Sequence, residues 1–194
     1  MTLQRIENSF LSSNTYVLTD GDKTILVDCG DVEKIDENLS IDAVFLTHPH
    51  FDHIYGLNKL MVRCPLCKIY ILQGGTEYLS SDRRNLSRYH ETPYSFVSNN
   101  ICEIYDGEII PISETLNVRV YATPGHNPIC ASYFIGNYFF TGDSYIPGIK
   151  TVFTLPRSNK TDALSSEEYI IQLWGEGIIL CPGHGKIVEK RQTI

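Results

Sequence analysis

The sequence contains no apolar run long enough to cross a lipid bilayer, and its first residues lack the basic-then-apolar order of a signal peptide. It also lacks an excess of positive charge, because 16 Lys and Arg stand against 23 Asp and Glu, for a formal net charge of -7. These absences argue against a membrane protein and against a nucleic-acid-binding surface. We therefore expect a soluble, cytoplasmic protein with neither nucleic acid nor a membrane as a partner.

No linker, low-complexity tract or block of like charge divides the 194 residues, of which 42% are hydrophobic and 20% charged. This length and balance are typical of one compact domain with a complete core. We predict a single domain over residues 1–194.

The chain also lacks a second partner for its one C-x-x-C pair, Cys64 and Cys67. A structural zinc site of that type needs another pair at a suitable spacing. In the absence of an export signal, the six cysteines are expected to be reduced thiols. We interpret the pair as part of a loop between a helix and a strand, with a zinc or redox role as the alternative.

Short apolar or alternating runs predict strands at residues 3–7, 15–19, 24–28, 43–46, 69–72, 101–105, 118–122, 129–135, 138–141 and 178–181. Helical patterns follow at residues 54–62, 76–81, 83–90 and 165–174, with a weaker one at 31–37. Turn residues between the first three strands predict a meander, and Gly136 with Asn137 predicts a tight hairpin. Strand-rich halves that each end in a helix indicate a layered α/β domain.

Three imidazoles and one carboxylate lie within six consecutive residues, although the whole chain has only 6 His. Residues i and i+2 of an extended chain point the same way, and Pro49 favours that conformation, so His48 and His50 should face one point. Asp52 has the character of a helix N-cap, so the chain should turn there and direct Asp52 and His53 toward a second point. This segment can therefore offer ligands to two metal ions; the alternative is a polar turn that happens to carry histidines.

Three later turns each place one potential ligand directly after a predicted strand. They are Pro-Gly-His at His126, Gly-Asp at Asp143 and Pro-Gly-His-Gly at His184. Loops held by a rigid scaffold are where ligands are usually mounted. Each turn is a weak signal alone, but together with the first cluster they indicate a metal site. Asp28 also ends a strand, where it either orients a ligand histidine or simply forms the turn.

The order and spacing of these motifs resemble the metallo-β-lactamase superfamily, and within it the glyoxalase II-like hydrolase branch. The similarity runs from about Asn14 to Gly185. It implies an αββα sandwich of two mixed β-sheets with helices on the outer faces, and a binuclear metal site at one edge of the sheets.

The resemblance assigns one metal ion to His48, His50 and His126. It assigns the other to Asp52, His53 and His184. It makes Asp143 the bridge between the two ions and places Asp28 behind the ligands.

The function that this resemblance implies is hydrolysis of an ester-type bond, a thioester or a lactone, by a hydroxide that two divalent metal ions bridge. Zinc is the first choice of metal, with iron or manganese as alternatives. The catalytic carboxylates are Asp52, which could orient the water or take its proton, and Asp143. The alternatives are a mononuclear iron oxidoreductase similar to sulfur dioxygenases and a non-enzymatic metal-binding module, against which the complete ligand set weighs.

Several residues indicate which substrate or activity to expect. Asn127 and Ile129-Cys130 stand where this branch often has Thr and Gly-Ser, so the substrate wall should differ. The β-lactamases of the superfamily generally lack the bridging Asp, so Asp143 argues against that activity. We interpret His90 as an exposed surface histidine, with a substrate-facing role as the alternative. The small-molecule substrate could be anionic. Residues that could bind it follow Asp143 in the sequence, and the alternative is that they are ordinary surface residues: Tyr145, Lys150, Arg157 and Lys160.

Overall fold

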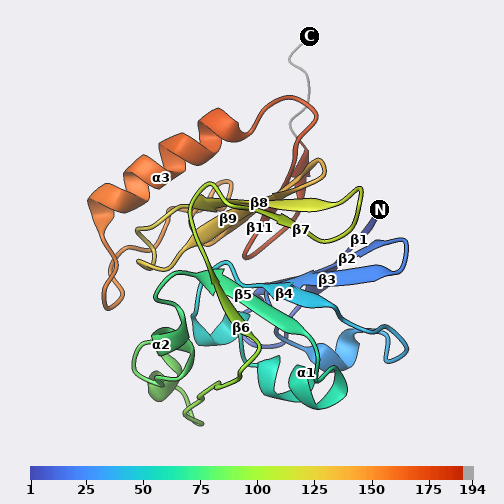
Figure 1. Ribbon diagram of the computed structural model, residues 1–194. Coiled ribbons are helices and arrows are strands. Elements are labelled where there is room, and N and C mark those ends of the chain that lie inside the picture. Colours follow the sequence, from blue (N-terminus) through green and yellow to red (C-terminus); the bar gives the residue numbers. More distant parts are fainter. Residues whose placement is uncertain (190–194) are drawn as a thin grey trace.

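The structure, a computed structural model, describes residues 1–189 and contains two six-stranded β-sheets that face each other (Figure 1). The first sheet runs in chain order through β1 Thr2–Glu7, β2 Asn14–Asp20, β3 Lys23–Val27, β4 Ala43–Phe45, β5 Lys68–Leu72 and β6 Ile101–Ile104. Its first three strands form the predicted antiparallel meander, and β3 to β6 pair in parallel.

The second sheet has the order β12-β11-β10-β9-β8-β7. Its strands are β7 Ile109–Pro111, β8 Asn117–Ala122, β9 Ala131–Ile135, β10 Tyr138–Gly142, β11 Ile179–Pro182 and β12 Val188–Glu189. Neighbouring strands are antiparallel except β10 and β11, which are parallel. Gly136 has the positive φ of +62° that the predicted hairpin between β9 and β10 requires.

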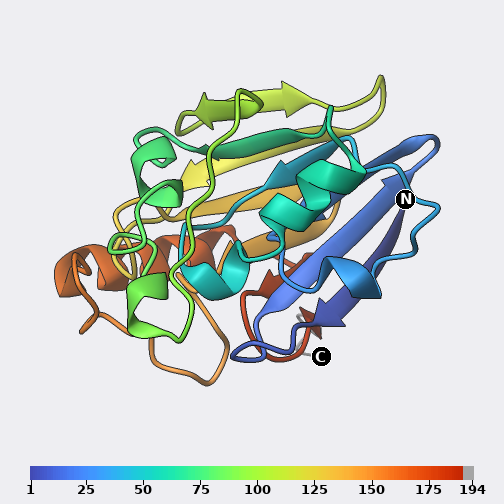
Figure 2. The same ribbon diagram turned by 90° about the horizontal axis from the view of Figure 1, so that it is seen from below.

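Helices cover the two outer faces, so the fold is the predicted αββα sandwich. The first sheet is covered by α1 Leu57–Arg63 and α2 Thr76–Leu79, which Figure 2 shows from below. The second sheet is covered by α3 Lys160–Leu173 (Figure 1). Single 3-10 turns occur at η1 Val32–Lys34, η2 Phe51–His53 and η3 Ser87–Tyr89. No helix in the described part of the chain combines the length and apolar character that crossing a membrane would need.

Aromatic side chains join the two sheets across the core. Phe45 of β4 meets Tyr133 of β9 edge to face, with ring centroids 5.5 Å apart. Tyr16 of β2 meets Phe140 of β10 in the same way at 5.2 Å. All four side chains are buried, and burying a large apolar side chain stabilises a fold by about 3 kcal/mol. The contacts therefore fix the distance between the sheets whose edge carries the candidate ligands.

The predicted helix at 54–62 with Asp52 as its cap is partly wrong. Asp52 lies inside the 3-10 turn η2, and α1 begins only at Leu57, after Gly56. The Asp52 carboxylate makes no cap hydrogen bond because it faces histidines instead. Gly56 passes so close to the Gly30 backbone that a Cβ atom there would lie 2.0 Å from the Gly30 carbonyl oxygen.

Other boundaries differ for local reasons. The helix predicted at 83–90 is reduced to η3, because Leu86 takes a left-handed φ of +66° that an α-helix cannot contain. The weak helix at 31–37 is likewise reduced to η1. The last helix starts at Lys160 rather than 165, since the Asn159 side chain accepts hydrogen bonds from the amides of Thr161 and Asp162 at 2.9 and 3.3 Å.

Candidate metal centre

The structure brings all seven predicted ligand residues together at one edge of the sandwich. They come from loops that follow β4, β8, β10 and β11, at the ends where these strands stop. They form three overlapping groups in which the ligand atoms lie within 4.8 Å of one another. These groups are His48, His50 and His126; Asp52, His53 and His184; and His48, His53 and Asp143.

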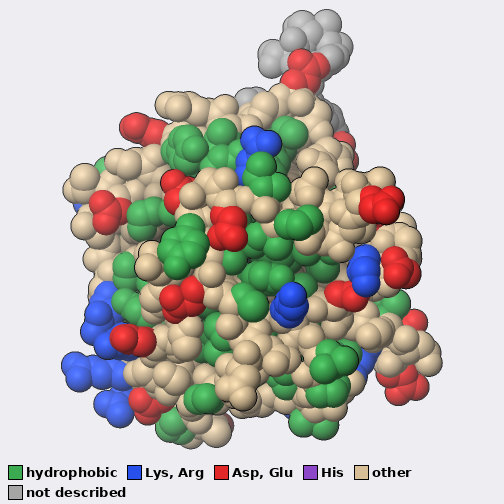
Figure 3. Space-filling model, viewed as in Figure 1, with side chains coloured by type: hydrophobic (Ala, Val, Ile, Leu, Met, Phe, Trp, Pro, Cys, Tyr) green, Lys and Arg blue, Asp and Glu red, His purple; other side chains and the backbone are tan. Residues whose placement is uncertain are grey.

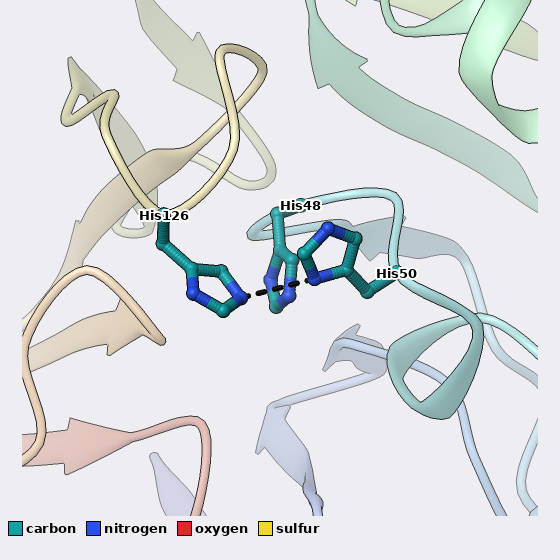
Figure 4. Close-up of side chains that lie close together, drawn as sticks. All are labelled: His48, His50 and His126. Atoms are coloured by element: carbon teal, nitrogen blue, oxygen red, sulfur yellow. Dashed lines mark hydrogen bonds between the residues drawn. The ribbon is translucent and has the colours of Figure 1, made fainter. Parts of the chain in front are cut away.

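The first group consists of three buried imidazoles that point toward one another (Figure 4). His48 and His50 lie on the segment after β4, whereas His126 reaches in from the second sheet. The His126 Nε2 and His50 Nδ1 atoms are 3.0 Å apart. Pro49 lies between the two first-sheet histidines, and the i and i+2 positions do face one point, as the sequence predicts.

The second group contains both a carboxylate and two imidazoles. The Asp52 Oδ2 atom is 3.3 Å from His53 Nε2 and 3.3 Å from His184 Nε2. Asp143 lies between the two groups, since its carboxylate oxygens are 3.6 Å from His53 Nε2, 3.4 Å from His184 Nε2 and 3.5 Å from His126 Nε2. This is the position that a carboxylate shared by two metal ions would need.

Several polar atoms at this point are buried without a hydrogen-bond partner among the described residues. They include His48 Nε2, His53 Nε2 and Asp143 Oδ1. An unsatisfied buried polar atom costs about 1–3 kcal/mol, so a fold retains such atoms only where something else satisfies them. Imidazole nitrogen and carboxylate oxygen are ligands that zinc, iron and manganese accept. The residues therefore fit divalent metal ions.

Hydrogen bonds to the far side of two of the imidazoles fix which nitrogen faces the cluster. His53 Nδ1 is 2.8 Å from Asp28 Oδ2, so Asp28 lies directly behind a predicted ligand. His126 Nδ1 is 2.9 Å from the Val152 carbonyl oxygen. Groups placed in this way behind metal-binding histidines set the tautomer and the ring orientation.

The sequence did not single out Asn127 as a partner of a ligand. Its side-chain nitrogen lies 3.0 Å from His50 Nε2, which leaves Nδ1 of that ring toward His126. Its side-chain oxygen accepts a hydrogen bond of 2.9 Å from the Ile129 amide. The position of an Asn directly after Pro-Gly-His was the available signal.

Two buried tyrosine hydroxyls donate hydrogen bonds to the loops that carry candidate ligands. Tyr133 donates a hydrogen bond of 2.6 Å to the Leu46 carbonyl, two residues before His48. Tyr16 donates one of 2.7 Å to the Pro182 carbonyl, two residues before His184. Both bonds cross between the sheets, so the metal centre is anchored in the core rather than on free loops.

The His184 turn is further restrained by close packing. Asn14 donates hydrogen bonds of 2.9 and 3.0 Å to the carbonyls of Pro182 and Gly185. A Cβ atom on Gly183 would lie 2.1 Å from Asp143 Oδ1, so only glycine allows this turn to approach the carboxylate.

The pKa values of the histidines differ between the first and the second ligand group. Burial lowers the pKa of His50 to about 3 and holds the pKa of His48 well below its usual range, with neighbouring imidazoles adding to both effects. Burial also acts to lower the pKa of His184, but its hydrogen bonds to Asp143 and Asp52 outweigh that effect and raise the pKa to about 9. His48 and His50 are therefore neutral, which is the form of imidazole that binds metal, whereas at His184 a metal ion would replace a proton.

A cleft of about 630 Å³ opens over this cluster. Its floor contains ligand residues, and its walls come from four segments: the loop between β1 and β2, the segment between β4 and α1, the loop between α2 and β6, and the loop between β10 and α3. The walls are formed by Leu11, Phe51, Leu86, Tyr89, His90, Val152, Leu155 and Pro156.

The interpretation of His90 as an exposed surface residue is wrong, whereas a substrate-facing role stays a prediction. His90 is half-buried and lines the cleft, with its ring packed edge to face on Phe10 at 4.8 Å. The residues suggested for an anionic substrate do not line the cleft. Tyr145, Lys150 and Lys160 line a separate hollow beside α3, and Arg157 lines another.

The cysteines are all free, as predicted, and none belongs to a metal-binding group among the described residues. Cys64 and Cys67 are both buried between α1 and β5. Burial raises the pKa of Cys67 to about 12, which suppresses the reactive thiolate. The loop interpretation of the C-x-x-C pair therefore fits better than a redox role.

A sandwich of two mixed sheets with imidazoles and carboxylates converging at one edge defines a class of metalloproteins. The chain belongs to the metallo-β-lactamase superfamily, whose family model matches residues 8–184. This match confirms the family that the motifs predict.

The relatives fall in more than one branch. The chain is 28% identical to the Beta-lactamase-like protein 2 homolog of Drosophila melanogaster over 98% of this chain and 62% of that protein. It is 28% identical to a hydroxyacylglutathione hydrolase of Salmonella arizonae over 72% of this chain and 50% of that protein. The solved structure of BLEG-1 B3 metallo-beta-lactamase superposes with a TM-score of 0.87 at 25% identity, covering 96% of this chain and 93% of that one. The chain thus spans less than two thirds of the length of these two curated relatives.

Proposed function

We infer that this protein is a metal-dependent hydrolase of an ester-type bond, a thioester or a lactone, acting as one domain over residues 1–194 in the cytoplasm. The observation that carries the proposal is the convergence of three ligand groups on one point, with buried ligand atoms that lack another partner. Support for the reaction type comes from the similarity to a protein named hydroxyacylglutathione hydrolase.

The proposed ligand assignment follows the two groups in the structure. One divalent ion, zinc in the first place, would be held by His48, His50 and His126, and a second by Asp52, His53 and His184. Asp143 would bind both. Such ions supply a Lewis acid for a carbonyl oxygen and lower the pKa of a water molecule toward about 7.

Residues of this chain orient the ligands and accept the proton of the attacking water. Asp28 holds the Nδ1 proton of His53, so that Nε2 stays free as a ligand atom. Asp52 lines the cleft and can accept a proton from the attacking water. Among the described residues that line the cleft there is no Ser, Thr or Cys, so no residue of these three types competes with water as the nucleophile.

The test measures metal content and hydrolysis on the same sample, with thioesters, lactones, phosphodiesters and a β-lactam as substrates. We expect two metal ions per chain and turnover of a thioester or a lactone, lost in His126→Ala and retained in the control Cys64→Ser. The β-lactam is included because BLEG-1 is described as a B3 metallo-beta-lactamase. A single iron per chain with oxygen consumption and no hydrolysis would instead identify an iron oxidoreductase.

A further inference from the structure

The walls of the cleft are apolar and partly strained. Leu11 and Leu86 both take left-handed backbone conformations, with φ of +52° and +66°, which side chains other than Gly and Asn rarely adopt. Leu11 is 59% exposed and Tyr89 is 63% exposed, so large apolar surfaces face the opening. Among the described residues of the lining there is no Lys or Arg. Strained residues of this kind concentrate where a ligand is bound.

A second hollow of about 510 Å³ lies next to the cleft and has the opposite character. Tyr89 and Pro156 line both cavities, so the two lie on either side of the same two side chains. The second hollow is lined by three guanidinium groups, those of Arg83, Arg84 and Arg157. Figure 3 shows Lys and Arg side chains gathered at the edge of the molecule where Figure 1 places α2.

Two of the three arginines, Arg84 and Arg157, lie close to one aromatic ring. The Cζ atoms of Arg84 and Arg157 lie 5.3 and 5.8 Å from the centroid of the Tyr78 ring. Arg157 is also held in a left-handed conformation, with φ of +70°. Two like charges close to one ring repel each other, and an anion placed near both offsets that repulsion.

The charges of this hollow are only partly compensated. Arg84 pairs with Glu77, whereas Arg83 and Arg157 have no carboxylate within ion-pair distance among the described residues. Two uncompensated positive charges thus lie together on a chain whose formal net charge is -7. A phosphate group, which carries a charge of about -2 and accepts the forked hydrogen bonds of arginine, matches this pair.

We propose that the substrate is an amphiphilic thioester, whose apolar acyl chain lies in the cleft and whose thiol carrier bears a phosphate that Arg83 and Arg157 bind. This inference rests on the proposed hydrolase function. The bound carrier extends from the metal centre across Tyr89 and Pro156, the two side chains that line both cavities. The reaction forms a bond between the carbonyl carbon and the oxygen of water and breaks the bond between that carbon and sulfur. One proton of the water goes to the sulfur and the other to solvent, so the products are a carboxylate and the phosphorylated thiol.

The experiment compares hexanoyl thioesters whose carriers differ in charge and in size: hexanoyl-coenzyme A, hexanoyl-phosphopantetheine, the uncharged hexanoyl-pantetheine, and hexanoyl-glutathione, which carries carboxylates. We expect the ratio of kcat/KM for hexanoyl-coenzyme A to that for hexanoyl-pantetheine to fall about tenfold in the double variant Arg83→Gln/Arg157→Gln, at about threefold per exposed charge pair. The control Lys150→Gln/Lys160→Gln removes two charges from the other hollow and should leave the ratio unchanged. Hexanoyl-phosphopantetheine, which lacks the nucleotide, shows whether the phosphate next to pantetheine is sufficient.

The apolar wall is tested by Leu86→Asn, because Asn tolerates the left-handed conformation and changes only the polarity. We expect this variant to lower the preference for hexanoyl over acetyl thioesters about fivefold. Retention of that preference would overturn the assignment of the acyl chain to the cleft.

Binding separates failure of this inference from failure of the proposed function. Hexyl-coenzyme A, a thioether that cannot be hydrolysed, is titrated calorimetrically into the metal-loaded protein and its arginine variant. Arginine-dependent binding without turnover of any thioester would support the arginine site for the phosphorylated carrier and refute the hydrolase. Turnover that is equal for all carriers, or a preference for hexanoyl-glutathione that depends on the arginines, would overturn the phosphate assignment and leave the hydrolase standing.

Discussion

Replacing Asp28 by Asn changes the proton on His53 without changing the shape of the site. Asp28 Oδ2 accepts from His53 Nδ1 at 2.8 Å, while Oδ1 accepts from the Thr47 amide at 2.7 Å. An Asn that keeps its oxygen on the Thr47 amide turns its NH2 group toward His53 Nδ1. The His53 proton then moves to Nε2, which is the nitrogen that faces Asp52 and Asp143. In the opposite rotamer the Asn oxygen accepts from His53 Nδ1, and the Asn NH2 group then faces the Thr47 amide, so two hydrogen-bond donors meet.

Either rotamer is expected to lower the metal affinity of the ligand group that contains His53. Loss of such a hydrogen-bond partner costs about 10–100-fold in metal affinity, or about 1.4–2.7 kcal/mol. Asn tolerates the left-handed φ of +59° at this position, so the backbone adds little to the effect. We expect competition with a chromophoric chelator to show one ion bound about 10–100-fold more weakly, with the other nearly unchanged.

The matched control is Asp31→Asn, which removes another buried carboxylate three residues along the chain. Asp31 accepts hydrogen bonds from Ser9 and Tyr55 and contacts none of the proposed ligands. Equal affinities for both ions in Asp28→Asn, or the same loss in the control, would refute the view that Asp28 acts through His53.

Three further predictions follow from particular contacts. Asp143→Ala should lower the metal content from two ions toward one per chain and remove most hydrolysis, as measured by metal analysis, because Asp143 lies within 3.6 Å of imidazoles from both groups. Thiol titration of the denatured protein should find six free thiols, since all six cysteines are free. Burial acts to raise the pKa of Asp31, but hydrogen bonds from Lys34, Ser9 and Tyr55 outweigh it and hold that pKa well below its usual range. Asp31→Asn should therefore cost about 2 kcal/mol in urea unfolding above about pH 5, and the difference should shrink as the pH falls below about 4, where the wild-type carboxylate begins to lose its advantage over the unfolded chain.

The sequence predicted the parts of this molecule that depend on short-range patterns. The ligand segment is contiguous, so the facing of His48 and His50 followed from extended geometry alone. The long strands were found from their buried, alternating residues. The short strands β7 and β12 were not, because three or two residues carry no periodicity. The equally short β4 was found because all of its residues are apolar.

Contacts between distant segments could not be predicted in the same way. Asp52 was taken for a helix cap because the sequence does not show that His184, more than a hundred residues later, competes for its carboxylate. Leu86 interrupts the expected helix through a backbone conformation that leucine seldom adopts, so no propensity rule would place it there. The wall of the cleft depends entirely on such contacts.

The metal centre and the substrate wall are therefore held by different physical means. The ligand loops are tied to the core by Tyr16 and Tyr133, whose buried hydroxyls reach the carbonyls of Pro182 and Leu46. The wall consists of exposed apolar side chains on irregular loops, with Leu11 and Leu86 in strained conformations. Substitutions of exposed wall residues remove little buried surface, so they change which substrate fits at small cost in stability. Substitutions behind the ligands alter both metal affinity and the fold, because the same hydrogen bonds serve both. Selectivity in this chain can thus change independently of its chemistry.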